Sequence, residues 1–274
     1  MTTDYRIQIN LRFTCNNLSR SNVGVVTECH TQLHDMNVFR RAMSSASTLK
    51  QARKVVCIGR NYADHIAELN SARPKQPFFF LKPSSSILLP GEGPVVRPKG
   101  VDLHYEVELA LVMGKQLKDF SGNYQAALDA VESYALSIDM TARNTQNEAK
   151  KKGLPWSIAK GFDTFLPMGN IIPKSSIPDP HSVELYLTVN DKVRQSDSTE
   201  LMLFQIPRIL GDISKVMTLE KGDIVLTGTP KGVGPVVPGD IMKAGIKVDG
   251  KELEEAKIEV KIEESTSSYE YAET

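Results

Sequence analysis

Two glutamates stand at alternate positions in HYEVELALVM (104–113), where an apolar run follows them directly. Residues i and i+2 of a β-strand point to the same face, so the side chains of Glu106 and Glu108 are predicted to lie side by side. At ~6 Å and an effective dielectric constant of ~20, two ionised carboxylates repel each other by roughly 3 kcal/mol. Either this face is solvated at the edge of a sheet, or a cation offsets the repulsion.

A third acid in a similar setting favours the cation. Asp139 lies in ALSIDM (135–140), an apolar segment that is predicted to form a buried strand. Three carboxylates without cysteines or clustered histidines make an all-oxygen site, which suits Mg²⁺ or Mn²⁺ rather than Zn²⁺. Such an ion keeps positions open for substrate oxygens and acts as a Lewis acid on a carbonyl or an enolate.

A general base is expected near such an ion. His65 and Glu68 stand at i and i+3 in NYADHIAELN (61–70), so on a helix they share a face, where Glu68 would orient the imidazole and raise its basicity. An ordinary surface ion pair is the alternative. Lys160, in the mostly apolar WSIAKGF, is a further candidate, with a lysine whose stem covers apolar surface as its alternative.

The glycine-rich stretch TGTPKGVGP (227–235) superficially resembles a phosphate-binding loop. It lacks the GxxxxGK[ST] order, and GxGxxG occurs nowhere in the chain, so nucleotide binding is disfavoured. A tight turn that presents Thr229 and backbone N–H groups to an anion remains open.

Short strands with few helices between them must position these residues. Strands are predicted over 54–60, 78–81, 93–98, 107–114, 135–140, 183–190, 222–230 and 256–264. Helices are predicted over 61–70, 124–134, 141–153 and 204–217. NDK after residue 189 predicts a hairpin turn. This pattern indicates a β-rich α+β domain rather than a regular βαβ series.

The composition limits the class of partner. The chain has 274 residues, 41% of them hydrophobic, and 33 basic against 33 acidic residues, which disfavours nucleic acid and anionic membranes as main partners. Its three cysteines lack CxxC spacing, so a disulfide framework is not expected and a reducing compartment is. No run approaches the ~18 apolar residues of a membrane span.

The first 53 residues lack a sustained apolar period and are rich in Ser, Thr and Asn, which predicts a poorly ordered segment. Within it, residues 36–54 carry several basic residues and serines but no acid, as a mitochondrial presequence does. Either Met36 is the start of a targeting segment, or this is a basic linker in a cytoplasmic protein.

Several stretches resemble the fumarylacetoacetate hydrolase (FAH) family, and within it the group of FAH-domain-containing protein 1. They are CIGRNYADHIAE (57–68), FFLKPSSS (79–86), HYEVELALVMGK (104–115), LSIDMTARNTQNEAKKKGLPWSIAKGFDTF (136–165) and LEKGDIVLTGTPKGVGPV (219–236). The resemblance implies a catalytic domain over about 54–264, a C-terminal tail over 265–274, and a mixed β-sandwich roll with short helices, usually dimeric.

The resemblance also implies roles for single residues. The metal triad of the family falls on Glu106, Glu108 and Asp139, the three acids that the spacing selects. Its catalytic His–Glu dyad, on a segment that closes over the ligand, falls on His65 and Glu68. Its active-site lysine corresponds to Lys160, and the substrate-binding positions to Arg143, Gln146 and Thr229.

The activities implied are those of mitochondrial acylpyruvases, also described as oxaloacetate decarboxylases and oxaloacetate tautomerases. All three reactions act on a small 2-oxo acid and share an enolate that Mg²⁺ or Mn²⁺ stabilises. A fumarylpyruvate hydrolase or a sugar-acid dehydratase is the nearest alternative. A metal-stabilised scaffold would keep the three acids without needing His65 or Lys160, so their presence favours an enzyme.

Overall fold

The computed structural model describes residues 48–70 and 72–274. Most of the predicted presequence (36–54) and most of the N-terminal segment predicted to be poorly ordered therefore lie outside the described residues. Residues 48–53 are described, and Leu49 and Ala52 are buried there in an apolar cluster with Val55 of the first strand. The boundary at residue 53 stays a prediction.

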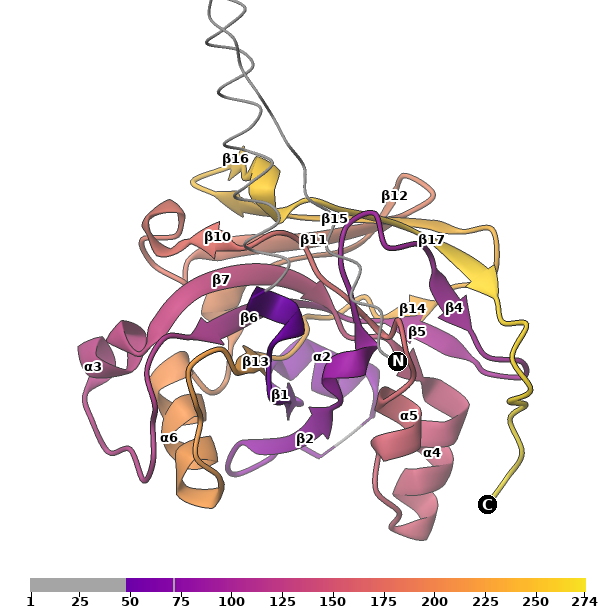
Figure 1. Cartoon of the computed structure of the whole chain (residues 1–274), viewed down its shortest axis with the longest axis horizontal. Helices are drawn as coiled ribbons and strands as arrows, with labels where there is room; N and C mark the ends of the chain where they lie inside the picture. Colours follow the sequence, from indigo (N-terminus) through magenta and orange to yellow (C-terminus); the bar gives the residue numbers. More distant parts are fainter. Residues whose placement is uncertain (1–47, 71) are drawn as a thin grey trace, which may run out of the picture. The chain divides into compact units, whose positions relative to one another are not determined.

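A mixed six-stranded sheet carries the predicted metal ligands (Figure 1). Its strand order is β10-β7-β6-β13-β1-β2, and only β1 and β13 are parallel neighbours. The bounds are β1 Val55–Gly59, β2 Phe78–Lys82, β6 Val107–Met113, β7 Val131–Ile138, β10 Ile172–Pro173 and β13 Ile224–Leu226. Strand β6 is an interior strand, so the solvated-edge interpretation of Glu106 and Glu108 is wrong.

A second sheet has the order β12-β11-β15-β17-β4, and β16 pairs with β15. Its bounds are β4 Val95–Arg97, β11 Val183–Val189, β12 Lys192–Ser198, β15 Ile241–Val248, β16 Lys251–Glu252 and β17 Ile258–Glu264. Smaller sheets combine β14 (Gly234–Pro235), β5 (Leu103–Tyr105) and β8 (Thr141–Ala142), and β3 (Ile87–Leu88) with β9 (Leu166–Pro167). Asn190 and Asp191, both with positive φ (50° and 60°), form the predicted hairpin turn between β11 and β12.

Both faces of β6 are buried, which explains its continuous apolar sequence. Leu109 and Leu111 point into the core that β6 shares with β11 and β15 of the second sheet. Ala110 and Val112 point to the opposite face, into a smaller cluster with residues of β1 and β13. By the same alternation Glu108 points to this second face, away from the main core.

Five α-helices lie wholly within the described residues: α2 Ala63–Glu68, α3 Tyr124–Asp129, α4 Arg143–Lys152, α5 Ser157–Lys160 and α6 Ile206–Val216. Residues 48–50 are helical as well. Short 3₁₀ turns cover Ser84–Ser86, Lys174–Ser176, Thr199–Leu201 and Glu254–Ala256. None of the helices in this part of the chain is long and apolar enough to cross a membrane.

The helix predicted over 124–134 is wrong in its second half. Helix α3 ends at Asp129, and Val131–Ile138 is strand β7, which pairs with β6 and β10. The local sequence permits a helix, but pairing on both sides within the sheet decides the structure of these residues. The predicted β-rich α+β class with mixed, sandwiched sheets and short helices is confirmed.

Candidate active site

The three predicted metal ligands come together where β6 begins and β7 ends. Val107 pairs with Ile138, and the backbone N–H of Asp139 donates to the carbonyl oxygen of Glu106 at 2.7 Å, so the antiparallel register places these acids side by side. Carboxylate oxygens of Glu106, Glu108 and Asp139 lie within 4.8 Å of one another, and all three residues are buried. The proximity of the three acids, which was predicted from their positions in the sequence, is confirmed. It follows from the pairing of β6 with β7.

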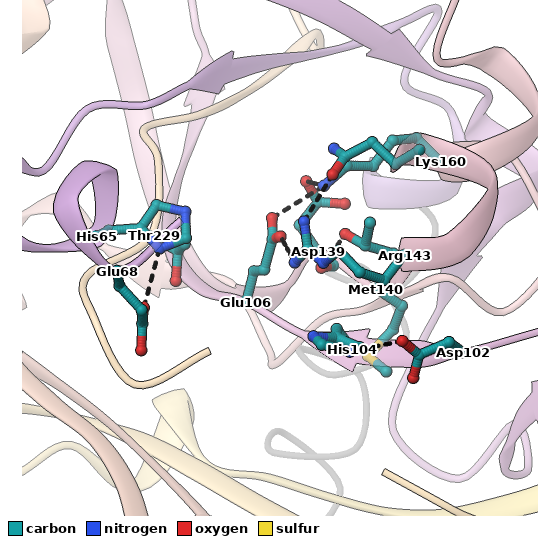
Figure 2. A network of polar contacts seen from close by, with 12 residues as sticks. His65, Glu68, Asp102, His104, Glu106, Asp139, Met140, Arg143, Lys160 and Thr229 are labelled. Carbon is teal, nitrogen blue, oxygen red and sulfur yellow. Dashed lines mark hydrogen bonds and ion pairs between the residues drawn. The ribbon is translucent and has the colours of Figure 1, made fainter. Parts of the chain in front are cut away.

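Three buried cations surround the acids. Figure 2 labels two of them, Arg143 and Lys160. The Lys160 Nζ donates to Glu106 Oε2 at 2.9 Å and to Asp139 Oδ2 at 2.6 Å. An Nη of Arg143 donates to Glu106 Oε1 at 2.5 Å, and the Lys82 Nζ donates to Asp139 Oδ1 at 2.7 Å. Buried charges are tolerated when they are paired and hydrogen-bonded, as these are.

The nearby positive charges offset the cost of burying an ionised carboxylate for Glu106 but not for Glu108. Burial opposes ionisation of Glu106, but Lys160 and Arg143 outweigh it and lower the pKa of this carboxyl well below its usual range. For Glu108, burial and the charges of Asp139 and Glu106 raise the pKa well above its usual value. Glu108 is therefore the acid that most needs a further positive charge in order to ionise.

The donor set fits a hard divalent cation. It consists of carboxylate oxygens alone, with no thiolate or imidazole in the cluster, and such ligands prefer Mg²⁺, Mn²⁺ or Ca²⁺ over Zn²⁺. A bound cation would hold Glu108 ionised beside the other two acids, because metal ligands bind in their deprotonated form. The site is thus suited to a divalent metal.

The predicted dyad lies on α2, the short helix after β1 (Figures 1 and 2). The His65 Nδ1 lies 3.3 Å from Glu68 Oε2, and burial of the ring lowers the pKa of His65 below 6.5, although Glu106 and Glu68 oppose this. The imidazole is therefore neutral near pH 7 and able to accept a proton. Glu68 also accepts hydrogen bonds from the Gly232 N–H at 3.1 and 3.2 Å.

The glycine-rich loop after β13 supports the triad directly. The N–H of Gly228 donates to Glu108 Oε2 at 2.6 Å. Gly228 has φ +95°, and a Cβ there would lie 2.7 Å from the Cβ of Asn61, so only glycine fits at this close approach. The next residue, Thr229, lines the cavity and accepts from the Gln195 amide at 2.9 Å.

Arg143 and Gln146 occupy the first turns of α4 and are bonded to each other. An Nη of Arg143 donates to Gln146 Oε1 at 2.6 Å, and its other Nη is the one that contacts Glu106. The Arg143 Nε is buried and has no hydrogen-bond partner among residues 48–70 and 72–274. A buried guanidinium with an unused donor is suited to an oxygen ligand.

An open cavity joins these groups, with about 390 Å³ of empty space that includes open solvent. Its lining includes seven of the predicted site residues: His65, Glu106, Glu108, Arg143, Gln146, Lys160 and Thr229. Asp139 lies beneath the lining and is fully buried, and Glu68 lies behind His65.

Sequence reasoning missed two buried polar residues that hold this arrangement. Lys82 ends β2 and bridges Asp139 and the carbonyl oxygen of Met140. Gln195 of β12 accepts from the Val107 N–H at 2.9 Å while donating to the Thr229 hydroxyl, and so connects the metal-ligand strand to the glycine-rich loop. A lysine that ends the apolar run FFFL was the one available signal for Lys82.

Comparison with known families adds a second line of evidence. The family described as fumarylacetoacetate (FAA) hydrolase C-terminal matches residues 54–260, which include every residue of the site. The chain belongs to the fumarylacetoacetate hydrolase family. Membership identifies it as an enzyme, and the fold class implied by the resemblance is confirmed.

Two similar FAH-family relatives are named for reactions of oxaloacetate. The mitochondrial oxaloacetate tautomerase of Schizosaccharomyces pombe is 58% identical over 219 residues, which cover 78% of this chain and 98% of the relative. The mitochondrial oxaloacetate decarboxylase of Dictyostelium discoideum is 49% identical over 195 residues, covering 71% and 88%. At this similarity, their shared location supports a mitochondrial location for this chain.

A solved FAH-family structure resembles the fold and contains a metal. The fumarylpyruvate hydrolase of Pseudomonas aeruginosa, determined with Mn²⁺ and pyruvate, is 32% identical with a TM-score of 0.70, covering 78% of this chain and 91% of that one. The acidic triad found here is consistent with a divalent metal in this family.

Proposed function

We propose that this enzyme acts on short 2-oxo acids, with a divalent metal, through an enolate. The observation that carries the proposal is one cavity lined by two acids of a buried triad, a neutral histidine and two buried cations. The named relatives act on oxaloacetate, which supports this substrate class. The expected reactions are tautomerisation and decarboxylation of oxaloacetate and hydrolysis of acylpyruvates.

Glu106, Glu108 and Asp139 would hold the cation, for which we propose Mg²⁺, with Mn²⁺ as the alternative. When bound, it supplies Lewis-acid stabilisation of negative charge on the substrate oxygens. Arg143, with Gln146 and Thr229, binds the substrate carboxylate, since an arginine fork matches a carboxylate. The Lys160 ammonium lies beside the acids, where it offsets enolate charge.

His65 is the proton carrier. In acylpyruvate hydrolysis it takes a proton from the water that attacks the distal carbonyl; cleavage of the C–C bond then yields a carboxylic acid and pyruvate enolate, which is reprotonated at carbon. In tautomerisation it moves a proton between C3 and the enol oxygen of oxaloacetate. Glu68 positions the ring. Decarboxylation releases CO₂ and needs no base for its bond-breaking step.

The test measures pyruvate formation from acetylpyruvate and from oxaloacetate, and enol–keto exchange of oxaloacetate, each with Mg²⁺ and with EDTA. We expect metal-dependent turnover, and His65→Ala should reduce acylpyruvate hydrolysis more than oxaloacetate decarboxylation. Equal losses in both reactions would contradict the role given to His65. No turnover of either substrate, with Mg²⁺ still raising thermal stability, would refute the substrate class and leave the metal site standing.

Fumarylpyruvate belongs in the same assay. A structural neighbour is a fumarylpyruvate hydrolase, so a higher kcat/KM for fumarylpyruvate than for the other substrates would favour that alternative.

We further propose that the enzyme is a homodimer, as the family resemblance implies. Light scattering of the purified protein checks this.

A further inference from the structure

Two cations at the cavity have no acidic partner among the described residues. Arg60 follows β1, Lys150 lies on α4, and both line the cavity that contains Glu106 and Glu108. Within the described part of the chain, neither side chain forms a hydrogen bond or an ion pair, and each contacts an aromatic ring. This distinguishes them from Lys160, which is bonded to two acids of the triad.

An aromatic pair holds both cations. The Arg60 Cζ lies 5.5 Å from the centre of the Phe78 ring, and the Lys150 Nζ lies 5.5 Å from the centre of the Trp156 ring. The two rings contact each other edge to face, with their centres 5.7 Å apart. A ring face attracts a cation without neutralising it, so the positive charge remains available to a ligand.

The backbone at Arg60 is held in an unusual conformation. Its φ of +57° lies in the left-handed region, which is uncommon and strained for a long side chain. This residue lies between β1 and α2, and both Arg60 and His65 line the cavity. Strain of this kind concentrates at ligand sites.

The balance of positive and negative charge differs between the bottom of the cavity and its mouth. At the bottom, three acids of the triad face three cations, Lys82, Arg143 and Lys160. At the mouth, Arg60 and Lys150 add positive charge with no acid to match. Partial burial, together with Arg143 and Arg60, lowers the pKa of Lys150 to about 8, as expected for an ammonium in a positive environment.

We propose that Arg60 and Lys150 form a second carboxylate subsite, which makes 2-oxo acids with a carboxylate at the far end the preferred substrates. This inference rests on the proposed function, because the 2-oxo acid end of the ligand occupies the metal end of the cavity. A dianion places one charge at Arg143 and the other at the mouth. A monoanionic acylpyruvate leaves Arg60 and Lys150 without a partner.

Malate and lactate provide a matched pair of unreactive probes. They are the 2-hydroxy analogues of oxaloacetate and pyruvate, and malate carries the additional carboxylate. Their binding to the Mg²⁺-loaded full chain is measured by calorimetry. We expect malate to bind at least tenfold more tightly than lactate, since a charge-assisted contact contributes about 1.5–3 kcal/mol and 1.4 kcal/mol is tenfold.

Lys150→Gln and Arg60→Gln should each reduce the malate preference by about tenfold and leave lactate binding unchanged. Lys150→Arg and Arg60→Lys should retain most of it. Lys151→Gln is the matched control, because Lys151 is the exposed neighbour on α4 and does not line the cavity. In turnover, both Gln variants should raise the KM for oxaloacetate, with smaller effects on its kcat and on the KM for acetylpyruvate.

The outcomes separate this subsite from the proposed function. Equal binding of malate and lactate by the unmodified protein, or a malate preference that both Gln variants keep, overturns the subsite even if oxaloacetate is turned over. A malate preference that depends on Arg60 and Lys150, without turnover of any 2-oxo acid, supports the subsite and overturns the proposed reactions. Thermal unfolding of each variant identifies a loss of binding that comes from misfolding.

Discussion

Asp139 is the residue on which the buried charges converge. Its two oxygens accept from Lys82 and from Lys160, and it is fully buried. The pKa values of the two lysines are shifted in opposite directions. Burial lowers the pKa of both, but two acids, Asp139 and Glu106, more than compensate for Lys160 and raise its pKa, whereas the pKa of Lys82 remains lowered. Asp139 thus orients two lysines and is also one of the three carboxylates that could bind a metal ion.

Asp139→Asn should lower stability and abolish metal-dependent turnover. It removes the charge opposite two buried ammonium groups, and breaking a buried pair from one side costs about 3–5 kcal/mol. Chemical denaturation and turnover with Mg²⁺ measure the two effects. Asp163→Asn, at an exposed acid, is the control and should change neither. An Asp139→Asn protein with normal Mg²⁺-dependent turnover would refute its role as a ligand.

The protonation of His65 should set an acid limb for acylpyruvate hydrolysis. Because burial lowers the pKa of His65, the imidazole stays neutral down to a pH below 6.5 and activity is lost only as the pH falls through that lowered pKa. The pH dependence of kcat/KM for acetylpyruvate measures this limb. A limb centred above pH 6.5 would show that another group, or a protonated His65, controls the reaction.

The triad could be predicted from the sequence because i, i+2 spacing in an apolar strand is a local signal. Asp139 could be added to the triad because it lies in a second apolar segment, 135–140, which was predicted to form a buried strand. Lys82 and Gln195 could not be predicted in this way. Their roles depend on contacts with Asp139, Val107 and Thr229, which come from pairing between distant strands and have no periodic signature.

Helix α2 carries His65, the base that we propose, so its position would decide whether this base reaches the substrate. It has six residues and no side-chain N-cap, so its own helical stability is small. Glu68 anchors it to the Gly232 N–H, and Asp64 forms an exposed ion pair with Lys231 at 2.7 Å. The helix is therefore held by the loop that also contacts Glu108.

Glu68→Ala should loosen α2, since it removes the contacts with His65 and Gly232. We expect faster amide exchange over residues 63–69 and at least a tenfold loss of acylpyruvate hydrolysis, as a positioned base contributes about 10²–10⁴-fold. Asp64→Asn is the control on the same helix. Its exposed ion pair is worth about 1 kcal/mol or less, so this variant should stay within a few-fold of the unmodified protein. Unchanged exchange in Glu68→Ala would contradict the anchoring role.

Elements with strong periodicity were predicted correctly, including β6, α2 and α6. The exception over 124–134 has a physical reason. YQAALDAVESY contains good helix formers, yet Tyr134 is fully buried in a strand between β6 and β10. Burial of that ring and two rows of backbone hydrogen bonds outweigh helix propensities, which differ by less than about 1 kcal/mol per residue.

At the scale of the whole molecule, metal binding should stabilise the described fold as a unit. The proposed ligands lie in or directly beside the adjacent interior strands β6 and β7. A cation that binds the folded state adds RT ln(1 + [L]/Kd), about 2.7 kcal/mol at 100 times Kd. For a domain of this size that corresponds to a rise in Tm of roughly 5–10 °C. Scanning calorimetry with Mg²⁺ and with EDTA measures it. No rise in Tm at saturating Mg²⁺ and Mn²⁺ would contradict a metal site in the triad.

The parallel pairing of β1 with β13 also determines when the enzyme becomes active during its synthesis. Val55 pairs with Ile224, and β13 lies between β1 and β6, so the sheet that bears the triad stays split until the ribosome has passed Leu226. Until then β1 and β6 each expose an unpaired edge to other chains. Such long-range pairing slows folding and exposes the incomplete chain to aggregation. The enzyme can therefore become active only after the three residues of β13 have been synthesised and have paired with β1 and β6.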